Sequence, residues 1–337
     1  MDDAIDVIAD AFTQHGNHQA AFYPLQQLAS PTAADGDAFV WGHHLGAIRE
    51  PPRLALRFKS DVTEWVQQGE GTTREKFNVQ RGTFMGFVLL FDSSTGELLG
   101  LMNDGVVQHV RVGATAGVAC DQLARPDATS VGVLGSGGLA RTYVEAFAHV
   151  RDLSSVKVYS PTTAHRQSFA TEMGAELGVD IVSVDTPAEA MADVDIAATC
   201  TNAKRPVYDP EWLEAGAFLI DVSPSEIGDD TLAAVDAAFT TAPEPYVERA
   251  IGGEAHRERY RTTRGSRRYR ELPYPTLAEV LVGDVPGRRA DDETIYYNNR
   301  SAGVQFAALA DLVHRRATER GLGTEIPLGW FQQDVRN

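Results

Sequence analysis

The sequence predicts an α/β fold, in which a doubly wound parallel sheet follows an α+β unit with antiparallel strands. From Ser130 onward, short apolar runs typical of strands alternate with helical patterns, as in parallel sheets with helical crossovers. Glycines crowd the first of these strand-to-helix junctions, at Gly135, Gly137 and Gly138. The first third of the chain instead shows a hairpin pattern, which predicts antiparallel strands there.

The first third is predicted to contain both helices and strands. The alternation in "PRLALRFKSDV" indicates a strand, and the small residues of "RVGATAGVACDQLA" indicate a closely packed helix. In chain order we expect a helix and then a loop up to about Gly36, a strand at 52–62, a hairpin of strands at 84–91 and 97–102, and a helix at 111–124.

The rest of the chain is predicted to form the parallel sheet and a closing helix. We expect strands at 131–134, 156–160, 180–184, 194–199 and 217–221, helices at 138–150, 163–177 and 187–192, and one more strand within 238–243. The Arg-rich stretch at 245–270 predicts a helix or a surface loop, and 275–299 predicts helix, loop and strand. An amphipathic helix from Gly303 to about Arg320 is expected to end at Gly321 and Gly323.

The composition limits the classes of function. The chain has 337 residues, enough for two domains of roughly 100–200 residues each. Its formal charge of −17 would repel a polyanion such as nucleic acid. No apolar run approaches the ~18 residues of a membrane span, and the acidic start "MDDAIDVIADAF" does not resemble a signal peptide. We therefore expect a cytoplasmic protein that binds neither membrane nor nucleic acid.

Metal and redox motifs are missing from the sequence. The two cysteines, Cys120 and Cys200, form no CxxC pair, so reduced thiols are expected. No His or Asp spacing repeats a ligand pattern, so we expect no metal. His43 and His44 are predicted to lie in a loop, and His109 is of interest only because it lies near Arg111.

The glycine loop predicts a dinucleotide site. Gly135, Gly137 and Ala140 form the pattern G-x-G-x-x-A, with Ser136, Gly138 and Leu139 between them. In this pattern the first glycine permits a tight turn, the second lets backbone amides approach a pyrophosphate, and the third small residue allows close helix–strand packing. The loop follows a predicted strand and opens a predicted helix, which is the context that the motif requires. The alternative is a structural glycine turn.

The end of the second strand favours NADP(H) over NAD(H). An NAD site usually has an acidic residue there, about 20 residues after the glycines, to bind the ribose 2′-hydroxyl. Here Ser160 occupies that position, and Thr162 follows with His165 or Arg166 as the accompanying cation. These groups, with no acid to repel a 2′-phosphate, could bind one. The alternative is that Arg166 is a solvated helix residue.

Small and hydroxyl residues are expected to line the nicotinamide side of the crevice. "ATCTN" closes the fourth strand of the parallel sheet and supplies Thr199 and Thr201. "IDVSPSEIGDDTL" leaves the next strand at the same edge. In open α/β sheets, ligands bind at the carboxyl ends of the strands.

Together these segments resemble the ornithine cyclodeaminase/μ-crystallin family. The resemblance rests on "LLFDSSTGELLGLMNDG", "HVRVGATAGVACDQLARPDATSVGVLGSGGLA", "VYSPTTAHRQSFA", "EIGDDTL" and "NNRSAGVQFAALADLVHRRATERGLGTEIP". It implies a homodimer whose subunits have two domains. Residues 1–122 and 304–337 would form the substrate-binding and dimerisation domain, and 123–303 the Rossmann domain inserted between them. Family members act on α-amino acids through α-imino acids.

The resemblance also implies the substrate-binding residues. Arg111 matches the family's carboxylate-binding arginine at the start of the helix before the glycine loop, and its planar fork suits a carboxylate. Lys59 matches the family's active-site lysine on an N-terminal strand, and Arg57 shares its face if this is a strand. Arg111 and Lys59 are thus the expected catalytic residues, with Arg57 assisting in substrate binding. The alternatives are a capping or surface charge for Arg111 and an edge strand with solvated charges for Lys59.

One departure from the family bears on the substrate. Ornithine cyclodeaminases carry an Asp after the strand that here is "FLIDV", where it engages the distal amine. This chain has Ser223, Pro224, Ser225 and Glu226 there, with Ser223 as an expected substrate-binding residue, and Asp221 is close but could simply end the strand. We therefore expect a NAD(P)-dependent oxidoreductase that transfers hydride at the α-carbon of an amino or imino acid, as a ketimine reductase or amino-acid dehydrogenase does. An ornithine cyclodeaminase and a non-catalytic, crystallin-like NADPH-binding protein are the alternatives.

Overall fold

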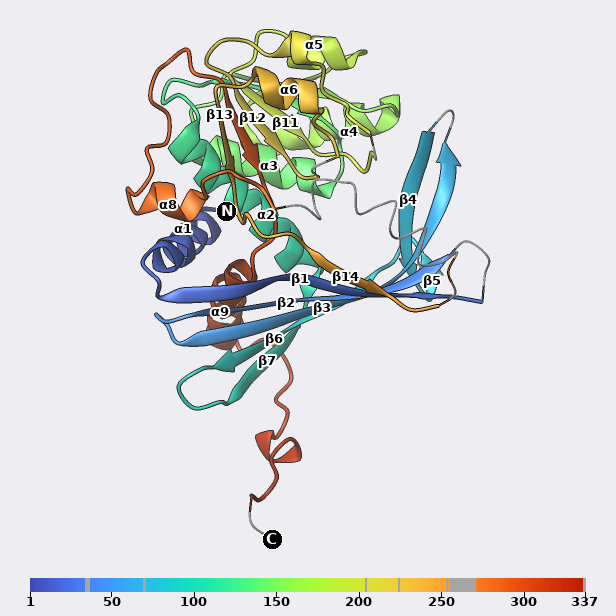
Figure 1. The fold of residues 1–337 in the computed structure, drawn as a ribbon, viewed down its shortest axis with the longest axis vertical. Coiled ribbons are helices and arrows are strands. Elements are labelled where there is room, and N and C mark those ends of the chain that lie inside the picture. Colours follow the sequence, from blue (N-terminus) through green and yellow to red (C-terminus); the bar gives the residue numbers. More distant parts are fainter. Residues whose placement is uncertain are drawn as a thin grey trace.

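The computed structural model has two sheets, one above the other in Figure 1, with helices between and around them. It describes residues 1–33, 37–68, 71–203, 205–223, 225–252, 254 and 271–335, and only the backbone of residues 65, 67, 68 and 71–74. Within these ranges, no helix combines the length and the apolarity that crossing a bilayer requires.

The large sheet is antiparallel except at one edge. Its strands follow the order β14-β1-β2-β3-β4-β5; β6 pairs with the first half of β3, and β7 pairs with β6. The strands are β1 (Ala20–Pro31), β2 (Ala38–Ile48), β3 (Arg53–Gln68), β4 (Gly71–Asn78), β5 (Gln80–Arg81), β6 (Met85–Asp92), β7 (Leu98–Asn103) and β14 (Val247–Ala250). The predicted hairpin, β6 and β7, and the predicted strand, within β3, are confirmed.

Two strands of this sheet occupy stretches that we predicted as loops. The loop expected before Gly36 contains β1, and the loop expected around His43 and His44 is β2. In β1 a register shift between Tyr23 and Gln26 breaks the alternation. In β2 the interior glycines Gly42 and Gly46 lower the apparent strand propensity.

The second sheet is entirely parallel and doubly wound, as predicted. Its order is β10-β9-β8-β11-β12-β15-β13, and it places the first strand of the α/β series between the second and the fourth. This is the Rossmann arrangement, in which the order reverses beside the first strand. The strands are β8 (Ser130–Leu134), β9 (Ser155–Tyr159), β10 (Asp180–Ser183), β11 (Ile196–Thr199), β12 (Phe218–Asp221), β13 (Ala237–Thr240) and β15 (Ile295–Asn298).

The helices join the two sheets through a continuous apolar core. The long helix α9 packs on β2 and β3, while α2 packs on α1, α3 and α9. The helices are α1 (Asp2–Gly16), α2 (Asp104–Leu123), α3 (Gly138–Val150), α4 (Thr163–Leu177), α5 (Pro187–Met191), α6 (Asp229–Ala234), α8 (Leu277–Leu281) and α9 (Gly303–Glu319), with 3-10 turns η1 (Pro210–Trp212) and η3 (Leu328–Trp330). Helices α3 and α4 have the predicted bounds.

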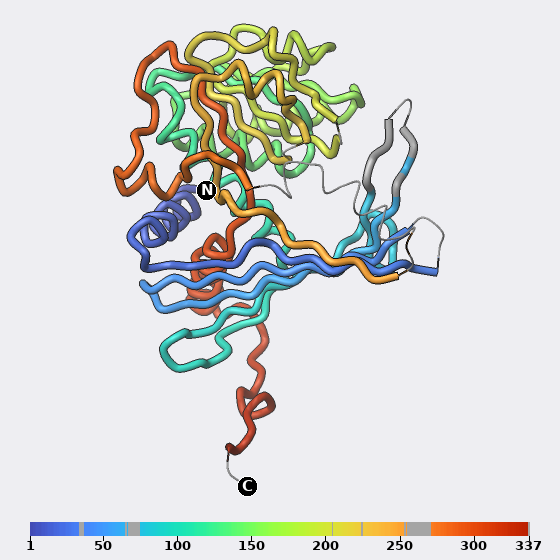
Figure 2. Tube along the Cα trace, viewed as in Figure 1, coloured from blue at the N-terminus to red at the C-terminus, as the bar shows by residue number. Residues whose placement is uncertain are grey.

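One segment links the two sheets in an unexpected way. Figure 2 shows the orange stretch that contains β14 lying along the blue strand β1, although more than 200 residues separate them. Gln26–Ala29 pair in parallel with Val247–Ala250. The expected boundaries therefore need an amendment, because β14 falls within 123–303 but belongs to the large sheet. Of the predicted 245–270 stretch, residues 253 and 255–270 lie outside the described residues.

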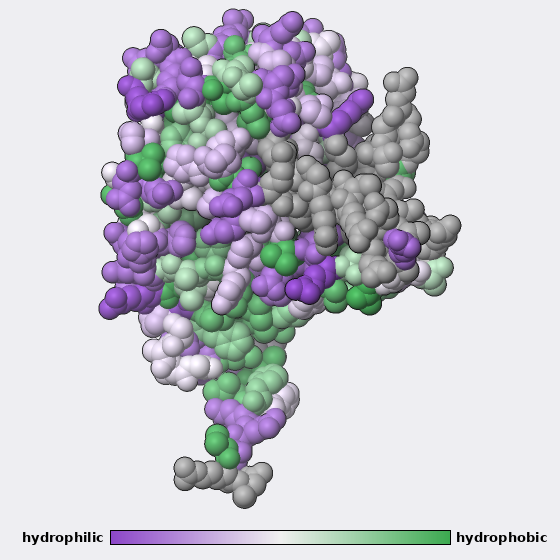
Figure 3. All heavy atoms as spheres, in the orientation of Figure 1, coloured by the Kyte–Doolittle hydropathy of each residue, from purple (hydrophilic) through white to green (hydrophobic). Residues whose placement is uncertain are grey.

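The large sheet has one covered face and one half-exposed face. Burial alternates strictly along β2: Val40, Gly42 and His44 are buried, whereas Trp41, His43 and Leu45 are half-buried. In Figure 3 apolar residues gather low in the view, around this sheet, while hydrophilic residues predominate higher up. The buried face looks toward α9 and α2, and it carries the charged residues discussed next.

Candidate active site

Arg57 and Lys59 project from the buried face of β3. Their side chains are only 6% and 9% exposed, and β3 has a strand on either side along this stretch. The alternative of an edge strand with solvated charges is therefore wrong. Two cations are thus held inside the protein on one face of β3, and positive charge at a buried site attracts an anionic ligand.

Glycines on both neighbouring strands make room at Lys59. The residue pairs with Gly42 on β2 and with Gly86 on β6. A Cβ atom at Gly42 would lie 2.8 Å from Lys59 Cε, and one at Gly86 would lie 2.5 Å from the Asp104 carboxylate. Only glycine at these two positions leaves space for both charged side chains.

Asp104 anchors Arg57. It is the first residue of α2, it is fully buried, and its Oδ2 accepts a hydrogen bond from Arg57 Nε within an ion pair. Among the described residues its other oxygen, Oδ1, has no hydrogen-bond partner. The guanidinium of Arg57 is thereby fixed between the sheet and the start of α2.

Arg111 approaches the same region from α2. The helix begins at Asp104, two turns earlier than predicted, so Arg111 lies inside the helix and not at its start. The alternative of a capping or surface charge is wrong, because the side chain is buried. Its Nη1 donates to Gln305 Oε1 over 3.2 Å, and Gln305 in turn donates to Thr115. Burial and the nearby Arg57 lower the pKa of Arg111 to about 10.

Phe306 brings the two arginines together. The guanidinium carbons of Arg57 and Arg111 lie 5.5 and 5.4 Å from the centre of its ring. The ring belongs to the first turn of α9, which packs so closely on β2 that a Cβ at Gly303 would lie 2.1 Å from the Leu45 carbonyl oxygen. A single aromatic ring thus holds two cations from different elements.

His44 completes the cluster, and the sequence analysis missed it. It lies on β2 directly opposite Arg57, with its ring 5.1 Å from that of Phe306. Burial first, and then Arg57, Arg111 and Lys59, lower its pKa well below 6.5. Alternation of Gly42, His44 and Gly46 with Trp41, His43 and Leu45 was the signal that could have placed it on a buried face.

The glycine loop has the geometry that a dinucleotide needs. Gly135 has φ +111°, and a Cβ there would lie 2.3 Å from the Cys200 carbonyl oxygen. Gly137 is the N-cap of α3, and a Cβ there would meet nothing within 4 Å. Ala140 is fully buried, whereas Leu139 is half-buried. The open space at Gly137, next to the N-terminal amides of α3, fits a pyrophosphate.

The end of β9 is tied to this loop. Ser136 Oγ donates to Ser160 Oγ over 2.8 Å. Arg166 donates to the Ser160 carbonyl over 3.0 Å and to Asp185 over 2.5 Å, so the alternative of a solvated helix residue is wrong. Thr162 is the exposed N-cap of α4. Hydroxyls and a guanidinium therefore surround the place where a ribose 2′-substituent would lie.

A buried carboxylate, also missed from sequence, fastens together the loops that follow β11 and β12. Glu226 accepts hydrogen bonds from Thr201 N over 2.5 Å and from Ser223 N over 2.8 Å. Burial, with Asp221 adding to it, raises the pKa of Glu226 to about 7. Thr199 next to it is fully buried, and within the described part of the chain its hydroxyl has no partner.

Asp221 has a structural position. Its carboxylate accepts hydrogen bonds from Tyr296 Oη over 2.6 Å and from Asn298 Nδ2 over 2.8 Å, both on the neighbouring strand β15. It is fully buried at the end of β12. These contacts hold the carboxylate against the sheet, in agreement with a residue that ends the strand.

Helix α2 brings the two halves of the site close together. A Cβ at Gly138 would lie 3.2 Å from the His109 ring, which therefore covers the glycine loop. Arg111 follows two residues later, so its side chain leaves α2 about 200° around the helix from His109 and faces the cluster around Phe306. Helix α2 therefore contacts the glycine loop through one side chain and the cation cluster of Arg57, Lys59 and Arg111 through another.

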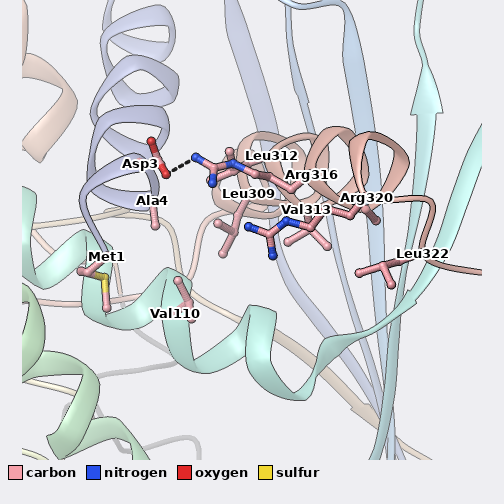
Figure 4. Close-up of a pocket in the computed structure, with 11 residues that line it drawn as sticks. Met1, Asp3, Ala4, Val110, Leu309, Leu312, Val313, Arg316, Arg320 and Leu322 are labelled. Atoms are coloured by element: carbon pink, nitrogen blue, oxygen red, sulfur yellow. Dashed lines mark hydrogen bonds and ion pairs between the residues drawn. The ribbon is translucent and has the colours of Figure 1, made fainter. Parts of the chain in front are cut away.

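A separate cavity of about 380 Å³ lies further along α9. Figure 4 shows Leu309, Leu312 and Val313 of α9 facing Val110 and the start of α1, with Arg316 paired to Asp3. None of the predicted site residues lines it. The cavity is therefore distinct from the cation cluster.

Comparisons with known proteins agree with this fold. The sequence model of the Ornithine cyclodeaminase/mu-crystallin family matches residues 44–321. A Delta(1)-pyrroline-2-carboxylate reductase of Bacillus cereus is 28% identical over 257 residues, which cover 75% of this chain and 77% of the relative.

Solved structures share the fold. A Thermococcus litoralis Delta(1)-pyrroline-2-carboxylate reductase in complex with NADH and L-proline superposes with a TM-score of 0.75 at 24% identity, covering 96% of this chain and 95% of that one. An archaeal alanine dehydrogenase dimer with bound NAD superposes with a TM-score of 0.74 at 19% identity, covering 97% of this chain and 94% of that one. Since the family model spans most of the chain, the protein belongs to the ornithine cyclodeaminase/mu-crystallin family.

Proposed function

We propose that this protein is a NAD(P)H-dependent reductase of small α-imino acids, of the ketimine-reductase type. The observation that carries the proposal is the buried cation cluster of Arg57, Lys59 and Arg111, because helix α2, which supplies Arg111, also contacts the glycine loop through His109. The matches to a Delta(1)-pyrroline-2-carboxylate reductase and an alanine dehydrogenase support an oxidoreductase that acts on C–N bonds. In the reverse direction the same site would serve an amino-acid dehydrogenase.

Each cation has a distinct task in this mechanism. Arg111, oriented by Gln305 and Phe306, binds the substrate carboxylate through its planar fork. Lys59 donates a proton at the substrate nitrogen. Arg57, fixed by Asp104, supplies a second positive charge beside the carboxylate. When bound, the nicotinamide cofactor supplies the hydride that adds to the α-carbon.

The chain also orients the reactants and excludes water. The cations lie on the covered face of the sheet beneath α9, where substrate binding leaves little room for solvent. Thr199, Thr201 and Ser223, at the ends of β11 and β12, would border the nicotinamide, and Glu226 fastens the last two through their backbone amides. With carboxylate and nitrogen both held, the α-carbon is fixed relative to the cofactor.

We further propose that NADP(H) is preferred. No acidic residue occupies the end of β9, and Ser160, Thr162 and Arg166 offer two hydroxyls and a guanidinium there. Asp185 already accepts a hydrogen bond from Arg166 but is itself exposed. A 2′-phosphate would take over that guanidinium contact.

The outer face of the large sheet supports a homodimer. Trp41, Phe58 and Phe87 form an aromatic row there, with ring centres 5.4 and 5.2 Å apart, and all three are only half-buried. Apolar surface of this kind marks an interface.

We assign the large sheet with α1, α2 and α9 to substrate binding and dimerisation, and the parallel sheet with its helices to the cofactor.

Ornithine cyclodeamination is the second candidate. Its support is the family membership. The stretch after β12, where a cyclodeaminase carries an Asp for the distal amine, has Ser223, Ser225 and Glu226 here, and Asp221 is engaged by Tyr296 and Asn298. The site therefore favours imine reduction.

The test follows the absorbance of reduced nicotinamide. NADPH and NADH are each mixed with the protein and cyclic ketimine carboxylates, or with pyruvate and simple amines, while ornithine with NAD is assayed for ammonia. We expect NADPH consumption with a ketimine carboxylate, abolished by Lys59→Met and strongly reduced by Arg111→Lys. Ammonia release from ornithine without net cofactor change would identify a cyclodeaminase instead, and tight NADPH binding without turnover would identify a binding protein.

A further inference from the structure

We propose that His44 is a substrate-contacting residue, whose imidazole donates a hydrogen bond to the substrate carboxylate beside Arg111. The inference rests on the proposed function, because it assumes that a carboxylate binds at the cation cluster. It adds a fourth group, from a different strand, to the three cations.

The first argument is that the imidazole has unused hydrogen-bonding capacity. His44 is only 2% exposed, and within the described residues neither Nδ1 nor Nε2 has a hydrogen-bond partner. A buried imidazole without partners loses the hydrogen bonds that water gave it in the unfolded chain. A ligand atom supplied from outside the chain would remove that cost.

The second argument is its position among the groups that attract the carboxylate. His44 faces Arg57 directly across β2 and β3. Both side chains contact the ring of Phe306, as Arg111 does from α2. A carboxylate bound by Arg111 at this ring would therefore lie near the imidazole.

The third argument concerns charge. The charged or titratable groups around His44 are Arg57 and Lys59 on β3, Arg111 on α2 and the adjacent His43, and all of them, together with burial, lower its pKa. Asp104, also on α2, is already paired with Arg57. His44 is consequently neutral at physiological pH, so it offers one N–H donor without adding a further positive charge.

A neutral donor at this position has a consequence for specificity. The cations attract any anion, but an N–H at a fixed site forms a hydrogen bond only with a ligand whose carboxylate oxygen lies within hydrogen-bonding distance of it. Replacing the carboxylate by a neutral amide should lose most of the binding free energy of this hydrogen bond. His44 thus contributes to binding much more than to the hydride step.

The experiment compares three variants of the full-length protein loaded with NADPH. His44→Leu removes the donor, His44→Gln keeps one, and His43→Leu changes the adjacent residue on the opposite face of β2. The probes are pyrrole-2-carboxylate, an unreactive planar carboxylate, and pyrrole-2-carboxamide. The Kd values of both probes are measured by calorimetry. For each variant, kcat and KM are measured with the ketimine carboxylate that the wild type reduces best.

For His44→Leu we expect the Kd of the carboxylate probe and the KM of the substrate to rise about ten- to a hundredfold. Its kcat should change less than about threefold, and the Kd of NADPH should not change. The preference for carboxylate over carboxamide should fall by a similar factor. His44→Gln should recover most of the binding, and His43→Leu should match the wild type.

Several outcomes would overturn the inference. If His44→Leu binds the carboxylate probe as tightly as the wild type, the imidazole makes no ligand contact. If His43→Leu causes an equal loss, or if His44→Gln recovers none of it, the residue acts through the fold. If the wild type neither reduces ketimines nor binds the carboxylate probe, the proposed function fails, and the inference fails with it. An active wild type with an unaffected His44→Leu would defeat the inference alone.

Discussion

Gly42 and Lys59 face each other across β2 and β3, and this pair shows how one missing side chain makes room for a functional one. A Cβ at Gly42 would lie 2.8 Å from Lys59 Cε. We predict that Gly42→Ala displaces the Lys59 tip, leaves the fold intact because that tip can move, and lowers kcat/KM about ten- to a hundredfold. Steady-state kinetics and a thermal melt test this.

Gly100→Ala is the matched control. Gly100 also lies in a strand of the large sheet, but a Cβ there would be 3.5 Å from the nearest atom, His314 Cδ2, which is an ordinary contact. Its kcat/KM should equal that of the wild type. Equal activity of Gly42→Ala would mean that Lys59 is not needed in its present position.

Gly135 and Gly137 should respond differently to alanine. At Gly135 the positive φ and the Cys200 carbonyl both oppose a side chain, so Gly135→Ala should destabilise the protein by roughly 1–3 kcal/mol and weaken NADPH binding. At Gly137 a Cβ meets no protein atom, so Gly137→Ala should leave the melting temperature unchanged but still weaken NADPH binding. A melt and a fluorescence titration separate the two effects; unchanged NADPH affinity in Gly137→Ala would argue against a pyrophosphate there.

At this scale, the sequence put forward Arg57, Lys59 and Arg111 but neither His44 nor Glu226. Strand alternation puts Arg57 and Lys59 on one face, and the family resemblance marked Lys59 and Arg111. His44 was missed because β2 was predicted as a loop, so the alternation along it was not used. Glu226 could not be found either, because its partners are backbone amides of two loops, and the sequence does not indicate how loops fold back on each other.

At the level of elements, Glu226 fastens the loop after β11 to the loop after β12. Its folded-state pKa is raised from 4.5 to about 7, so the folded protein holds this proton more tightly than the unfolded chain does. The contribution of the neutral Glu226 carboxyl group to the free energy of unfolding is therefore fully present below about pH 4.5, and it is lost as the pH rises through about 7.

Glu226→Gln, which does not titrate, isolates this effect. We predict that the free energy of unfolding of the wild type, relative to Glu226→Gln, falls by up to about 3 kcal/mol between pH 5 and pH 8. Urea denaturation at both pH values measures it. A difference that stays constant, or one that grows with pH, would show that the carboxyl group is not held in its neutral form by burial.

The elements of the parallel sheet were predictable, whereas five of the eight strands described for the large sheet were not. Strands β8 to β12 are short runs rich in apolar residues and alternate with helical patterns, so local pattern identifies them. Strand β14 is short and polar, and only its pairing with β1 makes it a strand. Helix α2 was predicted too short because the Asn103 side chain, which accepts a hydrogen bond from Gly105 N and caps the helix, precedes an Asp-Gly pair typical of turns.

For the whole molecule, the aromatic row of Trp41, Phe58 and Phe87 predicts how two copies associate. Charges introduced at Trp41 and Phe58 should oppose burial of this face. We expect the double variant Trp41→Glu/Phe58→Glu to elute as a monomer and the wild type as a dimer, as measured by light scattering after gel filtration. A wild-type monomer, or a double variant that remains a dimer, would contradict an interface on this face.

The central claim is that hydride moves between a nicotinamide and the α-carbon of a substrate whose carboxylate is bound by Arg111. The most direct measurement uses NADPH deuterated at C4 of the nicotinamide, a cyclic ketimine carboxylate and mass spectrometry of the product. We predict an amino acid carrying one deuterium at its α-carbon from the wild type, and none from Lys59→Met. An unlabelled product, or label appearing only in solvent, would contradict direct hydride transfer at this site.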